Sequence, residues 1–329
     1  MKAFEFAAPR NEGQVVELLA PHWGPTEILA GGTDLVGLLK RMVLAPERVV
    51  SLHNVASLGG IDATSQGVRI GATTHLDEML DEPALDGYAA VKQAIGGIAS
   101  LQLQSQGTLG GELCQRPHCW YFRNGRGLLA ENGRLVAGGE NRYHAILGNQ
   151  GPARFVSASR LAPALIALGA QIRLAGPAPG DETRMPLEWF YRAPRHEQER
   201  EYVLLPNQVL TDVYLPPVEG WSSGTYEVRH GAGPDAPLAA AAAALRIERG
   251  VVRDARIVMG HVAPTPWVSS EAATALVGRA VDADSALAAG EAAVAAATPL
   301  SDNRYKVQLA RVAVERAILL AAELETGGF

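Results

Sequence analysis

Two short glycine-pair motifs in the first third of the chain constrain its fold and chemistry more than any other feature. The first reads Leu29-Ala30-Gly31-Gly32-Thr33-Asp34-Leu35, and the second reads Gly107-Thr108-Leu109-Gly110-Gly111-Glu112-Leu113. Glycine lets a backbone turn tightly and approach a ligand closely, and a helix that begins after such a turn presents free N–H groups. Each motif therefore predicts a pyrophosphate-binding turn, although a strand-to-helix turn without a ligand has the same pattern. Neither motif reads G-x-G-x-x-G, so they do not form a Rossmann fingerprint.

The residues around the first motif predict a small β–turn–α–β unit. A strand at 27–30 runs into the glycine pair, a helix follows at 34–39, and a second strand lies at 48–52. The polar stretch 102–108 before the second motif carries no assigned element. Farther along, the pattern predicts a helix at 161–168, strands at 171–174 and 209–215, strand or helix at the alanine-rich 239–247 and 255–259, and helices at 286–297 and 304–324.

Composition limits the class of protein. The chain has 329 residues, of which 47% are hydrophobic and 19% are charged, as in an ordinary globular protein. A net charge of −6 argues against a nucleic-acid partner. No apolar run is long enough to cross a bilayer, and the N-terminus shows no targeting pattern, so we expect no membrane association and a cytoplasmic location. The two cysteines fit a reducing compartment.

A few side chains suggest chemistry of their own. Cys114, His118, Cys119 and His144 include metal-ligating residue types, but the C-x3-H-C spacing has no matching second pair, so zinc is disfavoured. The alternative is a pair of ordinary thiols beside an aromatic patch. His261 lies in an apolar run and is interpreted as a satisfied core or interface histidine. No residue has the pattern of a nucleophile, so no catalytic residue is assigned, and a cofactor is expected to supply the chemistry.

Several motifs together resemble one family. The ordered set AGGTDL, IGATTHLDEM, TLGGEL, QVLTDVYLP and TPLSDNRYK resembles the FAD-binding medium subunit of molybdenum hydroxylases, which include xanthine dehydrogenase, carbon monoxide dehydrogenase and aldehyde oxidoreductases. The stretches QRPHCWYFR and GENRYHAIL look most like the periplasmic aldehyde oxidoreductase flavin subunit. The resemblance extends from about Phe6 to about Leu319.

The resemblance implies an α+β fold and a division into domains. Residues 1–218 would form a two-part FAD-binding domain of the vanillyl-alcohol-oxidase (PCMH) type, with subdomains at about 1–55 and 56–218 and a long loop at 115–152. Residues 219–329 would form a smaller α+β C-terminal domain of the carbon monoxide dehydrogenase flavoprotein type. In the family the two glycine turns hold the FAD diphosphate and ribityl, which here implies residues 29–35 and 107–112. The strand at Leu210 would approach the flavin ring.

The resemblance also implies a function and partners. The chain would be an FAD-binding oxidoreductase component with two partners, a molybdopterin-binding large subunit and a [2Fe–2S] small subunit. It would pass electrons between these partners and an external acceptor. Two alternatives remain open. One is a stand-alone flavin-dependent oxidase or dehydrogenase recruited from the family, and the other is a relative that has lost FAD and serves as a binding or assembly protein.

Three departures from the family pattern bear on cofactors. The related insertion holds a [4Fe–4S] cluster through four cysteines, but only Cys119 has a match here. The stretches 127–129, 136–137 and 151–153, where its partners would lie, contain no cysteine, so no cluster is expected. The loop would then keep another packing role or be disordered. The family's asparagine after the second glycine pair is Glu112, and its aspartate before the next helix is Arg160. We predict that Glu112 and Arg160 pair, or that Arg160 itself meets the diphosphate.

Overall fold

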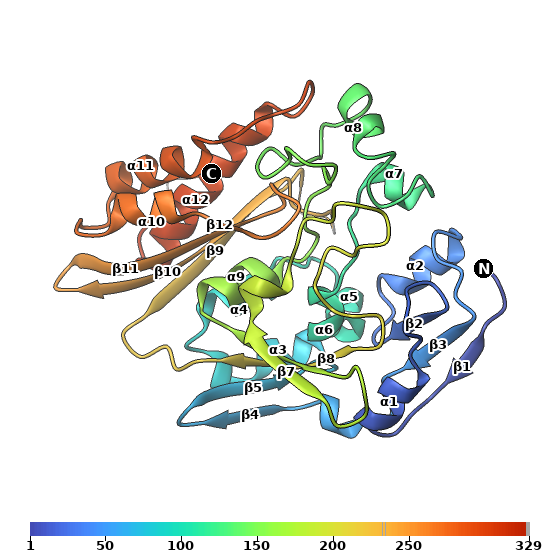
Figure 1. Ribbon diagram of the computed structural model, residues 1–329. Coiled ribbons are helices and arrows are strands. Elements are labelled where there is room, and N and C mark those ends of the chain that lie inside the picture. The colour runs from blue at the N-terminus through green and yellow to red at the C-terminus, as the bar shows by residue number, and fades with distance from the viewer. Residues whose placement is uncertain (232, 234, 327–329) are drawn as a thin grey trace.

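The computed structural model describes residues 1–231, 233 and 235–326, and within them the strands form three β-sheets (Figure 1). The first sheet has the order β1-β3-β2, the second β4-β5-β8-β6-β7, and the third β12-β11-β10-β9. The strands are β1 Glu5–Ala7, β2 Thr26–Leu29, β3 Arg48–Ser51, β4 Ile61–Thr64, β5 Gly67–Gly71, β6 Gln171–Ala175, β7 Glu182–Pro186, β8 Val209–Leu215, β9 Ser222–Val228, β10 Ala239–Glu248, β11 Val251–Gly260 and β12 Trp267–Val268.

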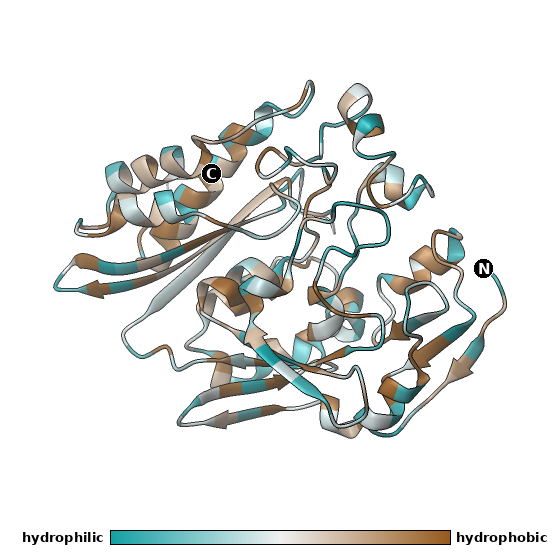
Figure 2. Cartoon of the chain, viewed as in Figure 1, coloured by the Kyte–Doolittle hydropathy of each residue, from teal (hydrophilic) through white to brown (hydrophobic). Residues whose placement is uncertain are grey.

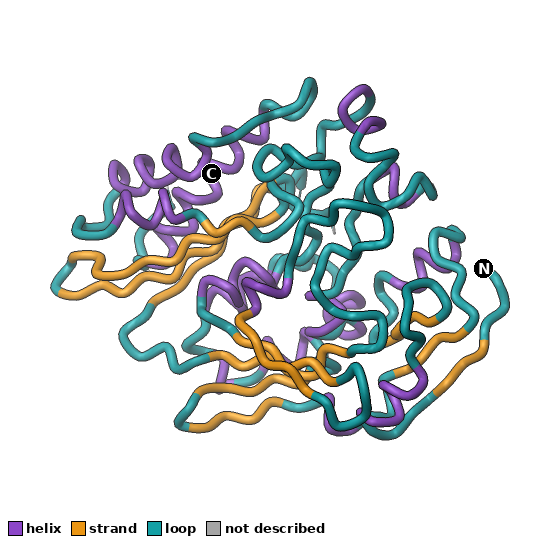
Figure 3. Tube along the Cα trace, in the orientation of Figure 1, coloured by secondary structure: helices purple, strands orange, loops and turns teal. Residues whose placement is uncertain are grey.

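The helices lie beside these sheets and between them (Figure 3). They are α1 Glu12–Leu18, α2 Leu35–Lys40, α3 Leu76–Asp81, α4 Ala89–Gly96, α5 Leu101–Gln106, α6 Leu109–Leu113, α7 Trp120–Arg123, α8 Arg134–Gly138, α9 Leu161–Ala167, α10 Ser270–Leu276, α11 Ala283–Val294 and α12 Tyr305–Ala321, with short 3-10 turns at Ala56–Leu58, Pro83–Leu85 and Leu187–Phe190. In the described part of the chain, none of them combines the length and hydrophobicity that a bilayer crossing requires.

The first sheet is the predicted β–turn–α–β unit. Strand β3 pairs in parallel with both β1 and β2, and β2 ends at the glycine turn that leads into α2. Asn11 caps α1 by accepting a hydrogen bond from the N–H of Gln14. The helix then buries Val15 and Val16 against Val50, so its apolar face closes a small core.

The second sheet is antiparallel and packs against α3, α4, α6 and α9 over the largest apolar core. Hydrophobic residues concentrate along its inner strands (Figure 2). The polar stretch before the second glycine motif, for which the sequence predicted no element, contains a helix, because residues 101–106 form α5. Ser100 caps this helix, and buried Gln104 donates to the carbonyl of Ile98. Hydrogen bonds rather than an apolar stripe hold α5, which explains why periodicity missed it.

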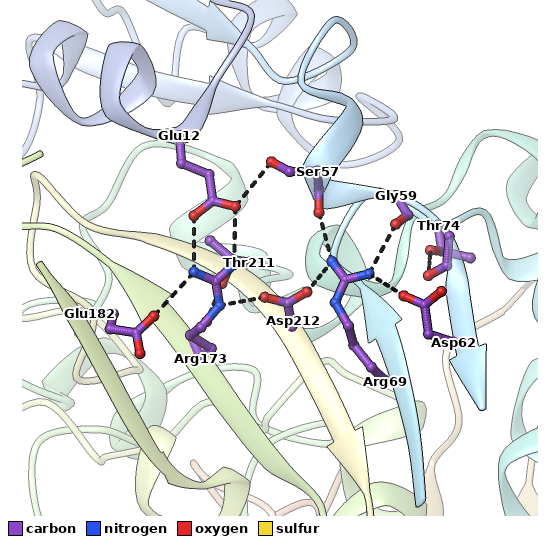
Figure 4. A network of polar contacts seen from close by, with 11 residues as sticks. Glu12, Ser57, Gly59, Asp62, Arg69, Thr74, Arg173, Glu182, Thr211 and Asp212 are labelled. Carbon is purple, nitrogen blue, oxygen red and sulfur yellow. Dashed lines mark hydrogen bonds and ion pairs between the residues drawn. The ribbon is translucent and has the colours of Figure 1, made fainter. Parts of the chain in front are cut away.

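A buried polar network joins the first sheet to the second (Figure 4). Asp212 on β8 is fully buried and forms ion pairs with Arg69 of β5 and with Arg173 of β6, where Arg173 Nε lies 2.7 Å from Asp212 Oδ2. Arg173 also makes two hydrogen bonds of 3.0 Å with Glu12 at the start of α1. A burial this complete is tolerated because each charge meets an opposite charge.

The third sheet shows that the alanine-rich segment is a strand rather than a helix. Strand β10 lies between β9 and β11, with helices on both sides. Ala241 and Ala243 belong to the core formed with α12, whereas Ala242 and Ala244 belong to the core of the second sheet. Alanine suits this position because both faces are tightly covered. Residues 115–152 form mostly irregular backbone with α7 and α8, and the predicted α+β class is confirmed.

Candidate functional site

The two glycine motifs lie directly against each other. A Cβ atom on Gly31 would come 1.6 Å from the carbonyl oxygen of Gln106, so only glycine allows the first turn to approach the second so closely. Gly32 has φ +76°, a conformation that glycine adopts without strain. Within the described residues, the backbone N–H groups of Gly32 and Thr33 donate to no acceptor. These free donors are suited to an anionic group.

In the second turn, by contrast, the backbone N–H groups of both glycines already have acceptors. Thr108 caps α6 by accepting from the N–H of Gly111 at 3.2 Å, and the N–H of Gly110 donates to the carbonyl of Ala72 at 2.7 Å. A Cβ on Gly110 would lie 2.9 Å from the Cβ of Ala72. The glycines of this turn therefore serve close packing against β5, and they bring the start of α6 to the first turn.

Two cavities meet at the glycine turns. The smaller, of about 140 Å³, has mostly apolar walls that include Trp23, Tyr202 and Leu204. The larger, of about 850 Å³, is lined by residues of the first turn, of the insertion at 115–152 and by His261. Of the predicted site residues, Ala30, Gly31, Gly32, Thr33, Asp34, Leu35, Thr108, Gly110, Gly111 and Leu210 line the smaller cavity, and Thr33, Asp34, Gly107, Gly111, Glu112 and Arg160 line the larger. Leu29 lines neither. Thr33, Asp34 and Gly111 are common to both, so the two cavities adjoin at these residues.

Asp34 connects the first turn to the insertion at 115–152. Its carboxylate accepts from the backbone N–H of Arg116 at 2.9 Å and lies 2.6 Å from Nη1 of Arg123. The side chain is therefore already paired, and Asp34 contributes to the cavity wall by anchoring the insertion.

Glu112 and Arg160 are in contact, but through the backbone. The N–H of Arg160 donates to Oε1 of Glu112 at 2.6 Å. The guanidinium points elsewhere: it donates to the carbonyls of Gly97, at 2.6 Å, and of Asp235, and lies 3.7 Å from Glu227. Glu112 and Arg160 therefore meet through a backbone hydrogen bond and do not form a side-chain ion pair, since the guanidinium lies nearer Glu227. A contact between Arg160 and the diphosphate stays a prediction. Burial raises the pKa of Glu112 to about 7 against the opposing effect of Arg160.

The insertion is held by an apolar cluster formed by Leu38, Cys119, Phe122, Leu128, Leu129, Ala153 and Phe155. Leu128, Leu129 and Ala153 belong to the stretches where cysteines were expected from the resemblance. Of the two alternatives predicted for this loop, a packing role and disorder, the structure shows the packing role. Sγ of Cys119 lies 3.2 Å from Nε2 of His144, and among the described residues no three His, Cys, Asp or Glu side chains gather as a metal site. The absence of an iron–sulfur cluster stays a prediction.

Sequence reasoning missed two features of the cavity walls. His261 is buried as predicted, with 2% of it exposed. Its Nε2, however, has no hydrogen-bond partner in the described residues, so the prediction that this histidine is fully hydrogen-bonded is wrong. Burial, with Arg160 and Lys306 nearby, lowers the pKa of this imidazole well below 6.5. A buried group of Arg116, Glu27, Glu201 and Arg200 also borders the smaller cavity. These charges are widely spaced along the chain, and no local pattern signals that they meet.

Comparison with known proteins assigns the family. A model described as the FAD binding domain in molybdopterin dehydrogenase matches residues 2–218, and one described as the CO dehydrogenase flavoprotein C-terminal domain matches residues 225–321. The chain belongs to this FAD-binding family. The predicted class, an FAD-dependent oxidoreductase subunit, is thereby confirmed, and the stand-alone and cofactor-free alternatives are not favoured.

Similar proteins span the whole chain. The aldehyde oxidoreductase FAD-binding subunit PaoB of Escherichia coli is 29% identical, covering 94% of this chain and 96% of its own. The carbon monoxide dehydrogenase medium chain of Hydrogenophaga pseudoflava is 25% identical, covering 96% of each. A solved structure of carbon monoxide dehydrogenase from that organism has a TM-score of 0.77 at 24% identity, over 97% of both chains. Quinoline 2-oxidoreductase from Pseudomonas putida has a TM-score of 0.76 at 24% identity, over 98% of this chain and 99% of its own.

Proposed function

We propose that FAD binds across both cavities, with its diphosphate at the wall that they share. The observation that carries this proposal is the pair of touching glycine turns, with the free N–H groups of Gly32 and Thr33 between two cavities. Backbone donors compensate negative charge without a side chain. FAD then supplies the redox chemistry, since it accepts two electrons and passes them on.

The character of each cavity suggests the orientation of FAD. The smaller cavity, of about 140 Å³, has apolar and aromatic walls that include Leu210 and Tyr202, and its size suits a flat two-ring group such as the adenine of FAD. The larger cavity, of about 850 Å³ and with Glu112 and Arg160 in its walls, has room for the flavin ring. The proposed cofactor-binding set is therefore residues 30–35, Gly107, Thr108, Gly110, Gly111, Glu112, Arg160 and Leu210, with Leu29 contributing only to the turn.

We also propose that the chain is an electron-carrying subunit that works with a molybdopterin-binding large subunit and a [2Fe–2S] small subunit in the cytoplasm. The relatives are named as an FAD-binding subunit and as medium chains, and they match end to end. The division into domains 1–218 and 219–329 is supported by the two family matches, which leave only residues 219–224 between them. No [4Fe–4S] cluster is part of this proposal.

The visible spectrum of the purified chain, before and after heat release of bound cofactor, tests the proposal. Flavin bands are expected, with FAD rather than FMN in the released fraction and less than about one-tenth of the four irons of a [4Fe–4S] cluster per chain. A colourless chain that takes up no added FAD would refute FAD binding. Co-purification of tagged chain with molybdopterin and iron–sulfur subunits tests the partners. A flavin-loaded chain that recovers no such subunit from its native host would refute that part alone.

A further inference from the structure

Two buried ion pairs lie beside the smaller cavity, and each contributes one side chain to its wall. Arg116 Nε lies 2.5 Å from Oε1 of Glu201, and Arg200 Nη2 lies 2.9 Å from Oε1 of Glu27. Arg116 and Glu27 line the cavity, whereas Arg200 and Glu201 do not. One cation and one carboxylate, taken from different pairs, therefore border the same small space.

Arg116 keeps one donor group without an acceptor. Its side chain is 8% exposed, and its Nη1 is buried with no hydrogen-bond partner among the described residues. The guanidinium lies over the ring of Phe122, with Cζ 4.8 Å from the ring centroid, so packing and Glu201 together fix its orientation. A buried donor on a charged group is costly when it is left without an acceptor. An acceptor atom of a ligand in the cavity would remove that cost.

Glu27 offers the complementary group. Its Oε1 accepts from Arg200, whereas its Oε2 accepts from no residue in the described part of the chain. The rest of the wall is mostly apolar and includes the rings of Trp23 and Tyr202, so the cavity suits a flat heteroaromatic base. A protein donor and a protein acceptor at its edge favour a base with an acceptor beside a donor. Adenine has this pattern, since its ring nitrogen N7 accepts beside the amino group that donates.

We propose that Arg116 and Glu27 are specificity-determining residues that recognise the adenine base of FAD in the smaller cavity. This inference rests on the proposed function. Nη1 of Arg116 donates a hydrogen bond to a ring nitrogen of adenine, and Oε2 of Glu27 accepts one from the amino group. Guanine and hypoxanthine carry a carbonyl oxygen in place of that amino group, and an oxygen has no proton to donate to Glu27. A flavin without adenosine, such as FMN, gains nothing from either residue.

Paired titrations with FAD and FMN test the role of Arg116. Isothermal titration calorimetry of the chain depleted of cofactor gives the affinity for each flavin. The variant Arg116→Met/Glu201→Gln removes the donor and leaves no unpaired buried charge. Its affinity for FAD should fall about tenfold or more, through the loss of one charge-assisted hydrogen bond, while its affinity for FMN stays unchanged. Arg48→Met/Glu5→Gln is the matched control, because it removes an ion pair of the first sheet that borders neither cavity.

A change of the base tests the role of Glu27. Deamination of the adenine in FAD replaces the amino donor with a carbonyl acceptor and leaves the rest of the cofactor intact. The wild-type chain should bind this deaminated FAD about tenfold or more weakly than FAD, because a buried acceptor is left facing another acceptor. In Glu27→Gln the side-chain amide can donate or accept, so the two affinities should lie within about threefold of each other.

Each outcome bears on the inference. Equal losses for FAD and FMN in the Arg116 variant would assign this residue a structural role, with a buried water as the partner of Nη1, and would overturn the proposal. Equal affinities of the wild-type chain for FAD and deaminated FAD would overturn it as well. A wild-type chain that binds no FAD would refute the proposed function itself, which separates the two failures.

Discussion

Replacing Asp212 by asparagine is expected to lower the free energy of unfolding by about 3 kcal/mol. Asp212 is fully buried and is shared by Arg69 and Arg173. Asparagine keeps one acceptor oxygen for one arginine and turns an NH2 group toward the other. One charge-assisted hydrogen bond, worth about 1.5–3 kcal/mol, is lost and the second is weakened.

The other partners of the two arginines limit this cost. Arg173 keeps both hydrogen bonds to Glu12, and Arg69 keeps Asp62 at 2.9 Å and the carbonyl of Ser57 at 2.6 Å. Neither cation is left without a counter-charge. The expected loss therefore lies at the lower end of the roughly 3–5 kcal/mol found when a buried pair is broken.

A urea titration followed by tryptophan fluorescence and circular dichroism measures the first unfolding transition. Glu182→Gln is the matched control, since this carboxylate lies 3.5 Å from the same Arg173 but its side chain is 51% exposed. The control should cost less than about 1 kcal/mol. A loss below about 1 kcal/mol for Asp212→Asn, or an equal loss for both variants, would refute the argument that this network joins the first two sheets.

Three further outcomes are expected. Gly31→Ala should abolish FAD binding in equilibrium dialysis, because its Cβ would lie 1.6 Å from the carbonyl oxygen of Gln106. The Cβ of the control variant Gly96→Ala meets nothing within 4 Å, so this variant should bind FAD normally. Wild-type affinity in Gly31→Ala would contradict the proposed site. The affinity for FAD should fall about fivefold from pH 5.5 to 8.5, as Glu112 loses its proton near pH 7 and adds a charge worth about 1 kcal/mol at 4 Å in water. Glu112→Gln should remove this dependence, and a pH effect that persists in it must come from another group. Arg160→Ala should lower the free energy of unfolding, measured by thermal denaturation, by about 2 kcal/mol, because the hydrogen bonds to the carbonyls of Gly97 and Asp235 are lost. Arg184→Ala, at an exposed side chain, is the control, and an equal loss in both variants would show that these hydrogen bonds contribute little.

Local chemistry explains which parts of the fold could be predicted. The strand, glycine turn and helix from Thr26 to Lys40 follow from short-range rules, and they lie within a residue or two of the predicted bounds. Helix α5 was missed because its stability comes from Ser100 and Gln104 rather than from an apolar stripe. Strand β10 could not be assigned because a run of alanines has no period, and its conformation depends on neighbours that are distant in sequence.

The candidate site divides in the same way. The glycine turns could be found from sequence because close backbone approach requires a specific residue type. The guanidinium of Arg160 could not be paired correctly, since its partner Glu227 lies on a strand 67 positions later in the chain and nothing local marks it. The buried Nη1 of Arg116 and Nε2 of His261, which have no hydrogen-bond partner within the described residues, were missed for a related reason. Their importance comes from atoms that lack a partner, and a sequence does not reveal which partners a fold provides.

Strand β10 makes the two domains mechanically dependent on each other. Ala241 and Ala243 of this strand face α12, whereas Ala242 and Ala244 face the core of the second sheet, so the same strand contributes to both hydrophobic cores. A hinge between the domains would have to separate packed alanine from that core, and it would also break hydrogen bonds such as that from the N–H of Thr225 to Oε1 of Gln93. We therefore expect the larger cavity, whose walls include Arg160, His261 and Lys306, to keep a nearly constant width. We expect a ligand to enter this cavity through local movement of loops rather than through closure of the two domains around it.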